Sequence, residues 1–175
     1  MNLLTAPVAS PIVIRLAQPQ DARAIAGLID ALEAHYGGEA CSPESTLAMV
    51  RDSMAEQEGT RHALAFAGGR PVGLACFAVL RPGFRLTGLV FLKELFVEEQ
   101  ARGQAVGAAL MRWLAAYARA RGLGRIDLTT EAGNRGARAF YERLRAEPMD
   151  KVFYRFNLST PVLTGEPGPA GEEKA

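Results

Sequence analysis

The hydrophobic pattern of the chain switches repeatedly between the period of a strand and that of a helix. This alternation limits the possible folds more than any other feature. Strands are predicted over residues 12–17, 62–67, 71–80, 86–97, 125–130 and 152–158. Helices are predicted over residues 19–35, from 43 to near 59, over 105–121 and over 134–144. The hairpin signal Gly68-Gly69 comes before two strand–helix units, which favours one α/β domain with a mixed sheet and helices on both faces.

The length of 175 residues fits a single domain with a sizeable core. We expect this domain to span residues 12–158, after a flexible N-terminus of residues 1–11. The tail of residues 159–175 is rich in Pro, Gly and Glu and has few large apolar side chains, so we expect it to be disordered.

The net charge of +1, from 20 basic and 19 acidic residues, predicts binding neither to nucleic acid nor to a membrane surface. The N-terminus lacks the basic region and the apolar core of a signal peptide, and no apolar stretch approaches the roughly 20 residues of a membrane span. We therefore expect a cytoplasmic protein. Arg far outnumbers Lys and Ala and Gly are abundant, a composition typical of GC-rich bacterial genomes.

The two cysteines, Cys41 and Cys76, have no spacing that would suit a metal site, so we expect no metal. Cys76 lies inside the apolar run 72–80, and we expect it to be a buried thiol that packs as a small hydrophobic residue.

The junction of residues 94–107 leads from an apolar strand through a short turn into a helix. Unpaired backbone N–H groups at a helix start attract anions, and small residues at 103, 105 and 107 would let a phosphate approach them. The junction is not a Walker loop, because no Gly-Lys-Ser/Thr follows, and G-x-G-x-x-G is absent. The alternative is an ordinary turn whose small residues serve packing.

A second junction, residues 128–141, also joins a strand to a helix. Asn134 is a good N-cap for that helix, and on this evidence alone it is a cap rather than a ligand contact. In the same way, Tyr141 is first a half-buried packing residue.

Together the two junctions resemble the GNAT superfamily of N-acetyltransferases. The acetyl-CoA motif of that family, Arg/Gln-x-x-Gly-x-Gly/Ala, corresponds to Arg102-x-x-Ala105-x-Gly107, with Ala105 in place of the first Gly. The later pattern Asn-x-x-Ala-x-x-Phe-Tyr is matched in full by Asn134, Ala137, Phe140 and Tyr141. The resemblance covers residues 12–158 and implies a GNAT-like α/β fold with a mixed, mostly antiparallel sheet. It also implies acetyl-CoA as cosubstrate, and a homodimer is common in the family.

The resemblance also implies functional roles for particular residues. The residues implied to bind the cofactor are Leu95, Phe96, Val97, Arg102, Gly103, Gln104, Ala105, Val106, Gly107, Ala108, Asn134 and Ala137. Free N–H groups near Phe96 and Val97 would form an oxyanion hole. Tyr141 would be the general acid, and Asn134 would bind the pantetheine arm.

Glu94, a charge inside an apolar strand beside the turn, is the best candidate for the general base. Its alternatives are a salt bridge or an exposed strand position. His62 could relay a proton but is more readily explained as structural, and no Cys or Ser is placed as a nucleophile. Transfer is therefore expected to be direct, within a ternary complex.

The acceptor is expected to be a primary amine, and Tyr36 and Glu39 could recognise its ammonium group. The segment 72–107 is most similar to the diamine (spermidine/spermine-type) branch, whose characteristic strand corresponds to residues 91–97, although Lys93 stands where that branch carries an acid. The alternatives are acetylation of a protein or peptide amine and a non-catalytic acetyl-CoA-binding module.

Overall fold

The computed structural model describes residues 11–38, 41–56, 59–82 and 87–158. The chain divides after Asn134 into two units, and each is described here by itself. The predicted flexible N-terminus, apart from Pro11, and the predicted disordered tail 159–175 lie outside the described residues.

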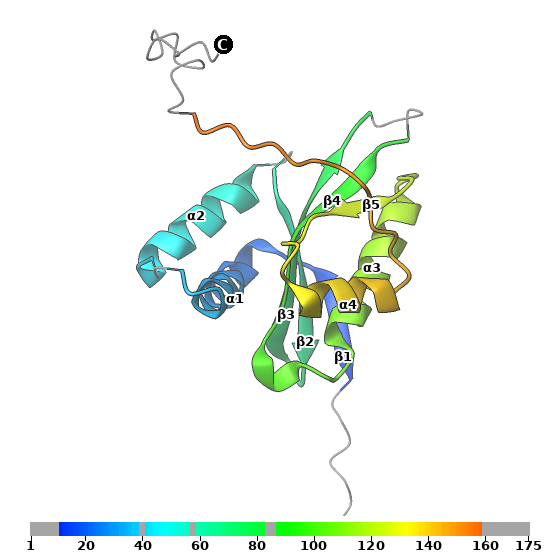
Figure 1. The fold of residues 1–175 in the computed structure, drawn as a ribbon. Coiled ribbons are helices and arrows are strands. Elements are labelled where there is room, and N and C mark those ends of the chain that lie inside the picture. The colour runs from blue at the N-terminus through cyan, green and yellow to red at the C-terminus, as the bar shows by residue number, and fades with distance from the viewer. Residues whose placement is uncertain (1–10, 39–40, 57–58, 83–86, 159–175) are drawn as a thin grey trace, which may run out of the picture. The chain divides into compact units, whose positions relative to one another are not determined.

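The first unit is built on a five-stranded sheet with the order β1-β2-β3-β4-β5 (Figure 1). The strands are β1 (Ile12–Leu16), β2 (Arg61–Ala67), β3 (Arg70–Leu80), β4 (Leu89–Val97) and β5 (Ile126–Leu128). The first four strands pair antiparallel, and β5 alone runs parallel to its neighbour β4. The predicted mixed, mostly antiparallel sheet is confirmed.

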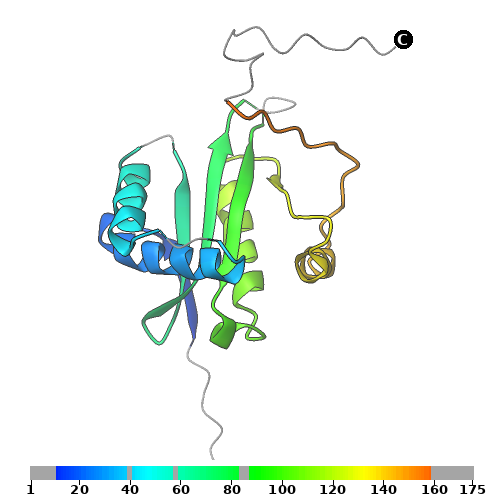
Figure 2. The ribbon, with the colours of Figure 1, turned by 60° about the vertical axis from the view of Figure 1, so that its left-hand side comes forward.

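Helices cover both faces of this sheet, as the sequence predicts. Helices α1 (Ala22–His35) and α2 (Pro43–Ala55) lie on one face, and α3 (Val106–Ala120) lies on the other (Figure 2). The short 3-10 turns η1 (Pro19–Asp21) and η3 (Glu99–Ala101) lead into α1 and toward α3.

Each face has its own apolar core. Under α1 and α2 the core includes Ile25, Leu28, Leu32, Val50, Leu64, Leu74, Cys76 and Phe96. Under α3 it includes Val72, Phe77, Val90, Leu92, Val106, Leu110 and Leu114. Fully burying a side chain of this size stabilises the fold by about 1.5–3 kcal/mol, so the two cores hold the three helices against the sheet.

Polar contacts fix the starts of α1 and α2. Asp21 accepts a hydrogen bond from the Gln18 N–H at 2.7 Å and pairs with Arg15 at 2.6 Å. The hydrogen bond from Arg15 lowers the pKa of Asp21, against the opposing effect of burial. The Ser42 hydroxyl caps α2 by accepting from the Ser45 N–H at 3.2 Å.

A β-bulge in β4 decides which side chains face which helices. Cys76 of β3 pairs with Glu94, whereas the next residue, Phe77, pairs with Leu92, so Lys93 is the extra residue. Leu92 lies in the core under α3, while Glu94 shares the opposite face with its partner Cys76. Without the bulge, Glu94 would lie on the same face as Leu92, in the α3 core.

The second unit contains one helix, α4 (Arg135–Arg143), in its described residues 135–158. The predicted strand over 152–158 is wrong, because the segment is extended without strand pairing and its apolar side chains are exposed. An alternating apolar pattern forms a strand only where a neighbouring strand satisfies its backbone, and the described part of this unit has no other strand.

Several predicted boundaries also differ. Strand β4 begins at Leu89 rather than 86, and β5 spans only three residues. Helix α2 ends at Ala55, before the predicted end near 59.

Candidate active site

The turn between β4 and α3 contains two residues with a left-handed backbone conformation. Gly103 has φ +77° and Ala105 has φ 60°, both in the left-handed region. Glycine adopts this region without strain, whereas the methyl group of Ala105 makes it unfavourable. Ala105, which departs from the family motif, therefore keeps the backbone conformation that glycine would give.

The start of α3 presents unpaired backbone donors. The first intrahelical bond runs from the Ala109 N–H to the Ala105 carbonyl at 2.9 Å. The N–H groups of Val106, Gly107 and Ala108 therefore precede the helical ladder and carry the positive end of the helix dipole. This arrangement suits an anionic group such as a phosphate.

Two side chains tie the turn to the end of β4 and to η3. The Arg102 Nε donates to the Val97 carbonyl at 3.1 Å, and the Gln104 amide donates to the Gln100 carbonyl at 3.0 Å. Both contacts are exposed, so the remaining guanidinium N–H groups of Arg102 can reach solvent or a ligand.

Close packing against β3 sets the position of the helix start. A Cβ added to Gly73 would lie 3.2 Å from Val106 Cγ1 and 3.1 Å from the Phe96 carbonyl oxygen. Position 73 thus brings three elements together: β3, the end of β4 and the first turn of α3. The role of Gly73 could not be predicted from the sequence, because the neighbours of a glycine inside a strand are known only from the fold.

Strands β4 and β5 pair over a short stretch only. The pairing joins residues 90–92 of β4 to residues 126–128 of β5. From Lys93 to Val97, β4 has a strand partner on its β3 side alone within the described chain. Alternate backbone groups of this stretch therefore face away from β3 without a ladder partner, as an oxyanion hole near Phe96 and Val97 requires.

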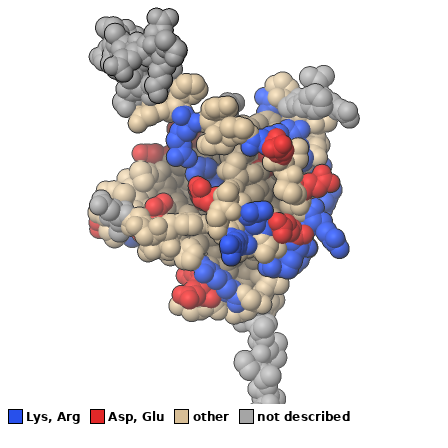
Figure 3. All heavy atoms as spheres, in the orientation of Figure 1, with Lys and Arg blue, Asp and Glu red and all other residues tan. Residues whose placement is uncertain are grey.

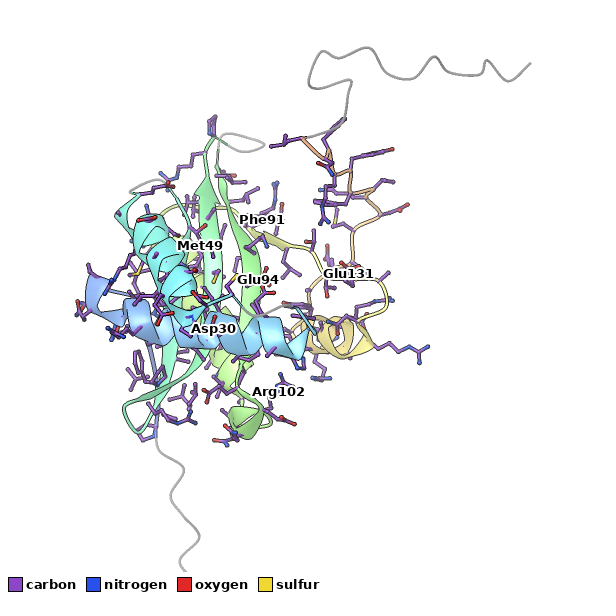
Figure 4. All side chains as sticks on the ribbon, turned by 90° about the vertical axis from the view of Figure 1, so that its left-hand side faces the viewer. Asp30, Met49, Phe91, Glu94, Arg102 and Glu131 are labelled. Atoms are coloured by element: carbon purple, nitrogen blue, oxygen red, sulfur yellow. The ribbon has the colours of Figure 1, made fainter. Side chains whose placement is uncertain are left out.

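Glu94 lies within this stretch, on the face that α1 and α2 cover (Figure 4). Its side chain is 34% exposed, and its Oε1 lies 2.7 Å from the Lys93 Nζ. The structure thus gives Glu94 the ion pair that the sequence left open, together with enough exposure to meet a second molecule.

Cys76 is the cross-strand partner of Glu94 and is buried. Burial, together with the charge of Glu94, raises the pKa of its thiol to about 12, while Lys93 has the opposite effect. A thiol with this pKa is protonated at neutral pH, so Cys76 is a packing residue, as predicted, and not a nucleophile.

The end of α1 contributes aromatic rings beside β4. The His35 ring lies 6.4 Å from the Phe96 ring and 5.3 Å from the Tyr36 ring, centroid to centroid. Tyr36, predicted as an acceptor contact, is 65% exposed, and Glu39 lies outside the described residues. His35 was not predicted as a site residue from the sequence, and its position beside Tyr36 at a helix end was the one signal that pointed to it.

His62 is on the same face of the sheet and pairs with Cys76 across β2 and β3. It is buried and lines a cavity of about 360 Å³ with Leu16, Ala17, Met54, Glu56, Thr60 and Arg61. Burial lowers the pKa of its imidazole, which is therefore neutral at pH 7. Cys76 lies between His62 and Glu94 in the row of paired residues.

The remaining predicted residues lie at or after the boundary of the second unit. Asn134 immediately precedes α4, and its N–H donates to the Glu131 carbonyl at 2.9 Å. Ala137 and Tyr141 are half-buried residues of α4, and the Tyr141 ring meets the Phe140 ring edge to face at 5.1 Å. The Asn-x-x-Ala-x-x-Phe-Tyr pattern thus forms the helix that was predicted for it.

Figure 3 shows basic and acidic side chains interspersed over the visible face. The described residues contain no cluster of three or more His, Cys, Asp or Glu side chains that could hold a metal ion. Likewise, none of the described helices is long and apolar enough to cross a membrane.

Comparisons with known proteins identify the family of the chain. The acetyltransferase (GNAT) family profile matches residues 27–145 of the chain. An uncharacterized N-acetyltransferase of Methanocaldococcus jannaschii is 33% identical over 85 residues, which cover 48% of this chain and 38% of the relative. The match therefore spans well under half of that relative's length.

Solved structures share the fold over most of their length. An integron cassette protein from the mobile metagenome of V. cholerae is 28% identical with a TM-score of 0.78, covering 83% of this chain and 92% of that one. An aminoglycoside N-acetyltransferase in complex with CoA is 18% identical with a TM-score of 0.71, covering 87% and 98% respectively. At that identity the second likeness concerns the fold alone.

The fold and the β4–α3 turn define an α/β protein of the acyltransferase type. The chain belongs to the acetyltransferase (GNAT) family, a family of acyl-CoA-dependent N-acyltransferases (EC 2.3.1.-).

Proposed function

We propose that the protein transfers an acetyl group from acetyl-CoA to a primary amine, directly and within a ternary complex. The observation that carries this proposal is the start of α3, where unpaired N–H groups, the small residues at 103, 105 and 107 and the Arg102 guanidinium converge on one turn. A helix start of this kind suits a pyrophosphate. Membership of the GNAT family supports acetyl-CoA as its source.

The energetic problem of the reaction is the acceptor. An ordinary alkylamine has a pKa near 10.4, so forming its neutral, nucleophilic state at pH 7 costs about 4–5 kcal/mol. Glu94 is the proposed acceptor of that proton, either directly or through a water molecule. Its side chain is partly exposed, and it lies in the stretch of β4 that does not pair with β5.

The rest of the chemistry concerns the thioester. The amine nitrogen attacks the thioester carbonyl carbon, and N–H groups near Phe96 and Val97 would stabilise the developing oxyanion. The C–S bond then breaks, the attacking nitrogen loses its second proton to solvent, and the Tyr141 hydroxyl would donate a proton to the leaving thiolate. Asn134 would hold the pantetheine arm. The roles of Tyr141, Asn134 and Ala137 rest on the family pattern.

Direct transfer is favoured over an acyl-enzyme. Cys76 is the cross-strand partner of Glu94 and has a buried thiol. The pKa of this thiol, about 12, leaves almost no thiolate at neutral pH. An acetylated enzyme would carry a mass increase of one acetyl group. Mass spectrometry of the protein mixed with acetyl-CoA and no amine is expected to find none.

The acceptor is proposed to be a small primary amine. The diamine branch remains one form of this proposal, and acetylation of a peptide amine is the competing one. A non-catalytic module is disfavoured because Tyr141, the family's acid position, is intact.

Binding and turnover test the proposal in turn. A thermal scan with acetyl-CoA at 100 times its dissociation constant is expected to gain about 2.7 kcal/mol of stability. Gly107→Glu is expected to fold and to lose this gain, because its carboxylate fills the turn and repels the pyrophosphate. A panel of small amines, diamines and peptides, followed by CoA release, then tests transfer. Absence of a thermal shift with the wild-type protein would reject the cofactor, and absence of CoA release would reject the reaction.

A further inference from the structure

The ammonium of Lys93 lies against the carboxylate of Glu94. Neighbouring residues of a regular strand point to opposite faces, so their side chains do not meet. Here the bulge at Lys93 removes that alternation, and the Nζ and Oε1 atoms lie 2.7 Å apart. The protein thus holds a positive charge beside its candidate base.

Both charges of this pair act on the neighbouring thiol of Cys76. Besides burial, Glu94 raises the pKa of the Cys76 thiol and Lys93 lowers it. The face around Glu94 therefore presents a paired positive and negative charge to an approaching molecule, and not a lone carboxylate.

Both charges remain accessible to a ligand. The Lys93 side chain is 68% exposed, and an ammonium has three N–H donors, of which Glu94 takes one. Figure 4 shows Glu94 and Phe91 on β4, with Asp30 on α1. The Asp30 carboxylate accepts a hydrogen bond from the Thr46 hydroxyl at 2.8 Å, so it already has a partner within the protein.

The geometry of the pair favours one class of acceptor. A molecule with an ammonium and a carboxylate on the same carbon can meet both charges at once: its ammonium faces Glu94 and its carboxylate faces Lys93. When the carboxylate of the ligand binds Lys93, the ion pair between Lys93 and Glu94 becomes weaker. A diamine offers a second cation instead, which Lys93 repels.

We propose that Lys93 is a specificity-determining residue of the acceptor site, and that it selects primary amines with an adjacent carboxylate, as in an α-amino acid, over diamines. This inference rests on the proposed transfer reaction and on the place of Glu94 in it.

The test compares α-amino acids with their carboxamides, and with a linear diamine, by CoA release. The measured quantity is the ratio of kcat/KM for the acid to that for its amide. The ratio is compared between proteins, so differences in intrinsic amine reactivity cancel. The variants are Lys93→Met, Lys93→Arg and Lys93→Glu, with Lys151→Met as the matched exposed-lysine control.

The ratio is expected to fall about fivefold in Lys93→Met, the upper range for an exposed charge pair. It should be retained in Lys93→Arg and Lys151→Met, and Lys93→Glu should raise kcat/KM for the diamine. A ratio that Lys93→Met leaves unchanged would overturn the inference while leaving the transferase intact. If the wild-type protein binds acetyl-CoA but no amine of the panel leads to CoA release, the proposed reaction is wrong, and this inference is wrong with it.

Discussion

Gly73 of β3 packs directly against Val106 of α3, so closely that a methyl group at position 73 would lie 3.2 Å from the valine side chain. The same methyl group would lie 3.1 Å from the Phe96 carbonyl oxygen of β4. We expect Gly73→Ala to destabilise the protein by about 1–3 kcal/mol through overpacking, and to weaken acetyl-CoA binding by displacing the helix start.

Thermal unfolding with and without acetyl-CoA measures both effects. Gly27→Ala is the control, because a Cβ there meets no atom within 4 Å and alanine is favoured inside a helix by about 0.5–1 kcal/mol. Equal stability of the Gly73→Ala and wild-type proteins would mean that α3 shifts without cost.

Ala105→Gly is expected to stabilise the turn before α3. Ala105 has φ 60°, a conformation that costs an L-residue with a Cβ roughly 1 kcal/mol relative to glycine. The greater freedom of glycine in the unfolded chain offsets part of this gain. Urea unfolding should give a net increase of about 0.5 kcal/mol, with acetyl-CoA affinity equal or higher. A loss of stability would show that the alanine methyl group makes a packing contact worth more than the strain.

Glu94→Gln tests the candidate base through the pH dependence of the rate. If Glu94 removes the acceptor proton, the variant should be slowed most at low pH, where the amine is almost fully protonated. Its rate should recover partly as the pH approaches the pKa of the amine, near 10.4 for an alkylamine. A defect of the same size at every pH would instead assign Glu94 to binding the acceptor.

Tyr141→Phe keeps the aromatic ring and its 5.1 Å contact with Phe140 but removes the hydroxyl. We expect the single-turnover rate to fall by about 10²–10⁴-fold with acetyl-CoA affinity nearly unchanged, as for loss of a general acid. Single-turnover measurement is needed because product release can limit kcat. An unchanged single-turnover rate would remove Tyr141 from the mechanism.

His62 makes stability depend on pH. Burial lowers the pKa of its imidazole below 6.5, so the folded protein binds the His62 proton less readily than the unfolded chain does. The contribution of the neutral His62 to folding stability is complete above pH 6.5. It is lost as the pH falls below 6.5 toward the pKa of His62 in the folded protein. The pKa of Asp21 is also lowered in the folded protein, and its contribution to stability is lost only as the pH falls below 3.8.

Urea midpoints between pH 8 and pH 5 measure this loss. His62→Leu should flatten the dependence, while His35→Gln, a change of the other histidine of the chain, which is exposed, should leave it as in the wild type. A wild-type midpoint that stays constant from pH 8 to pH 5 would contradict the burial of a neutral His62.

The strands and helices of the first unit followed from the sequence because their periods are long and their ends carry clear signals, such as Ser42-Pro43 before α2. The turn at 102–107 was likewise predictable from its small residues. The segment 152–158 was predicted wrongly, because an alternating pattern states which side chains would share a face but does not supply a partner strand.

The bulge at Lys93 could not be predicted for a related reason. Its effect on Glu94 depends on the register with β3, which is a property of two strands and not of one. The sequence identified Glu94 as a charge in an apolar strand but left open which face it occupies. Its contact with Lys93 and its pairing with Cys76 both follow from that register.

The same bulge lets β4 lose one residue without exchanging its faces. If Lys93 were deleted, Leu92 and Glu94 would become direct neighbours, and neighbours in a regular strand point to opposite faces, as these two side chains already do. The leucine would stay in the apolar layer beneath α3, and the carboxylate would stay on the face of its partner Cys76. The deletion would remove the lysine and its ion pair with Glu94. At this point of the chain, evolution is therefore free to vary both the chemistry of the extra residue and its presence.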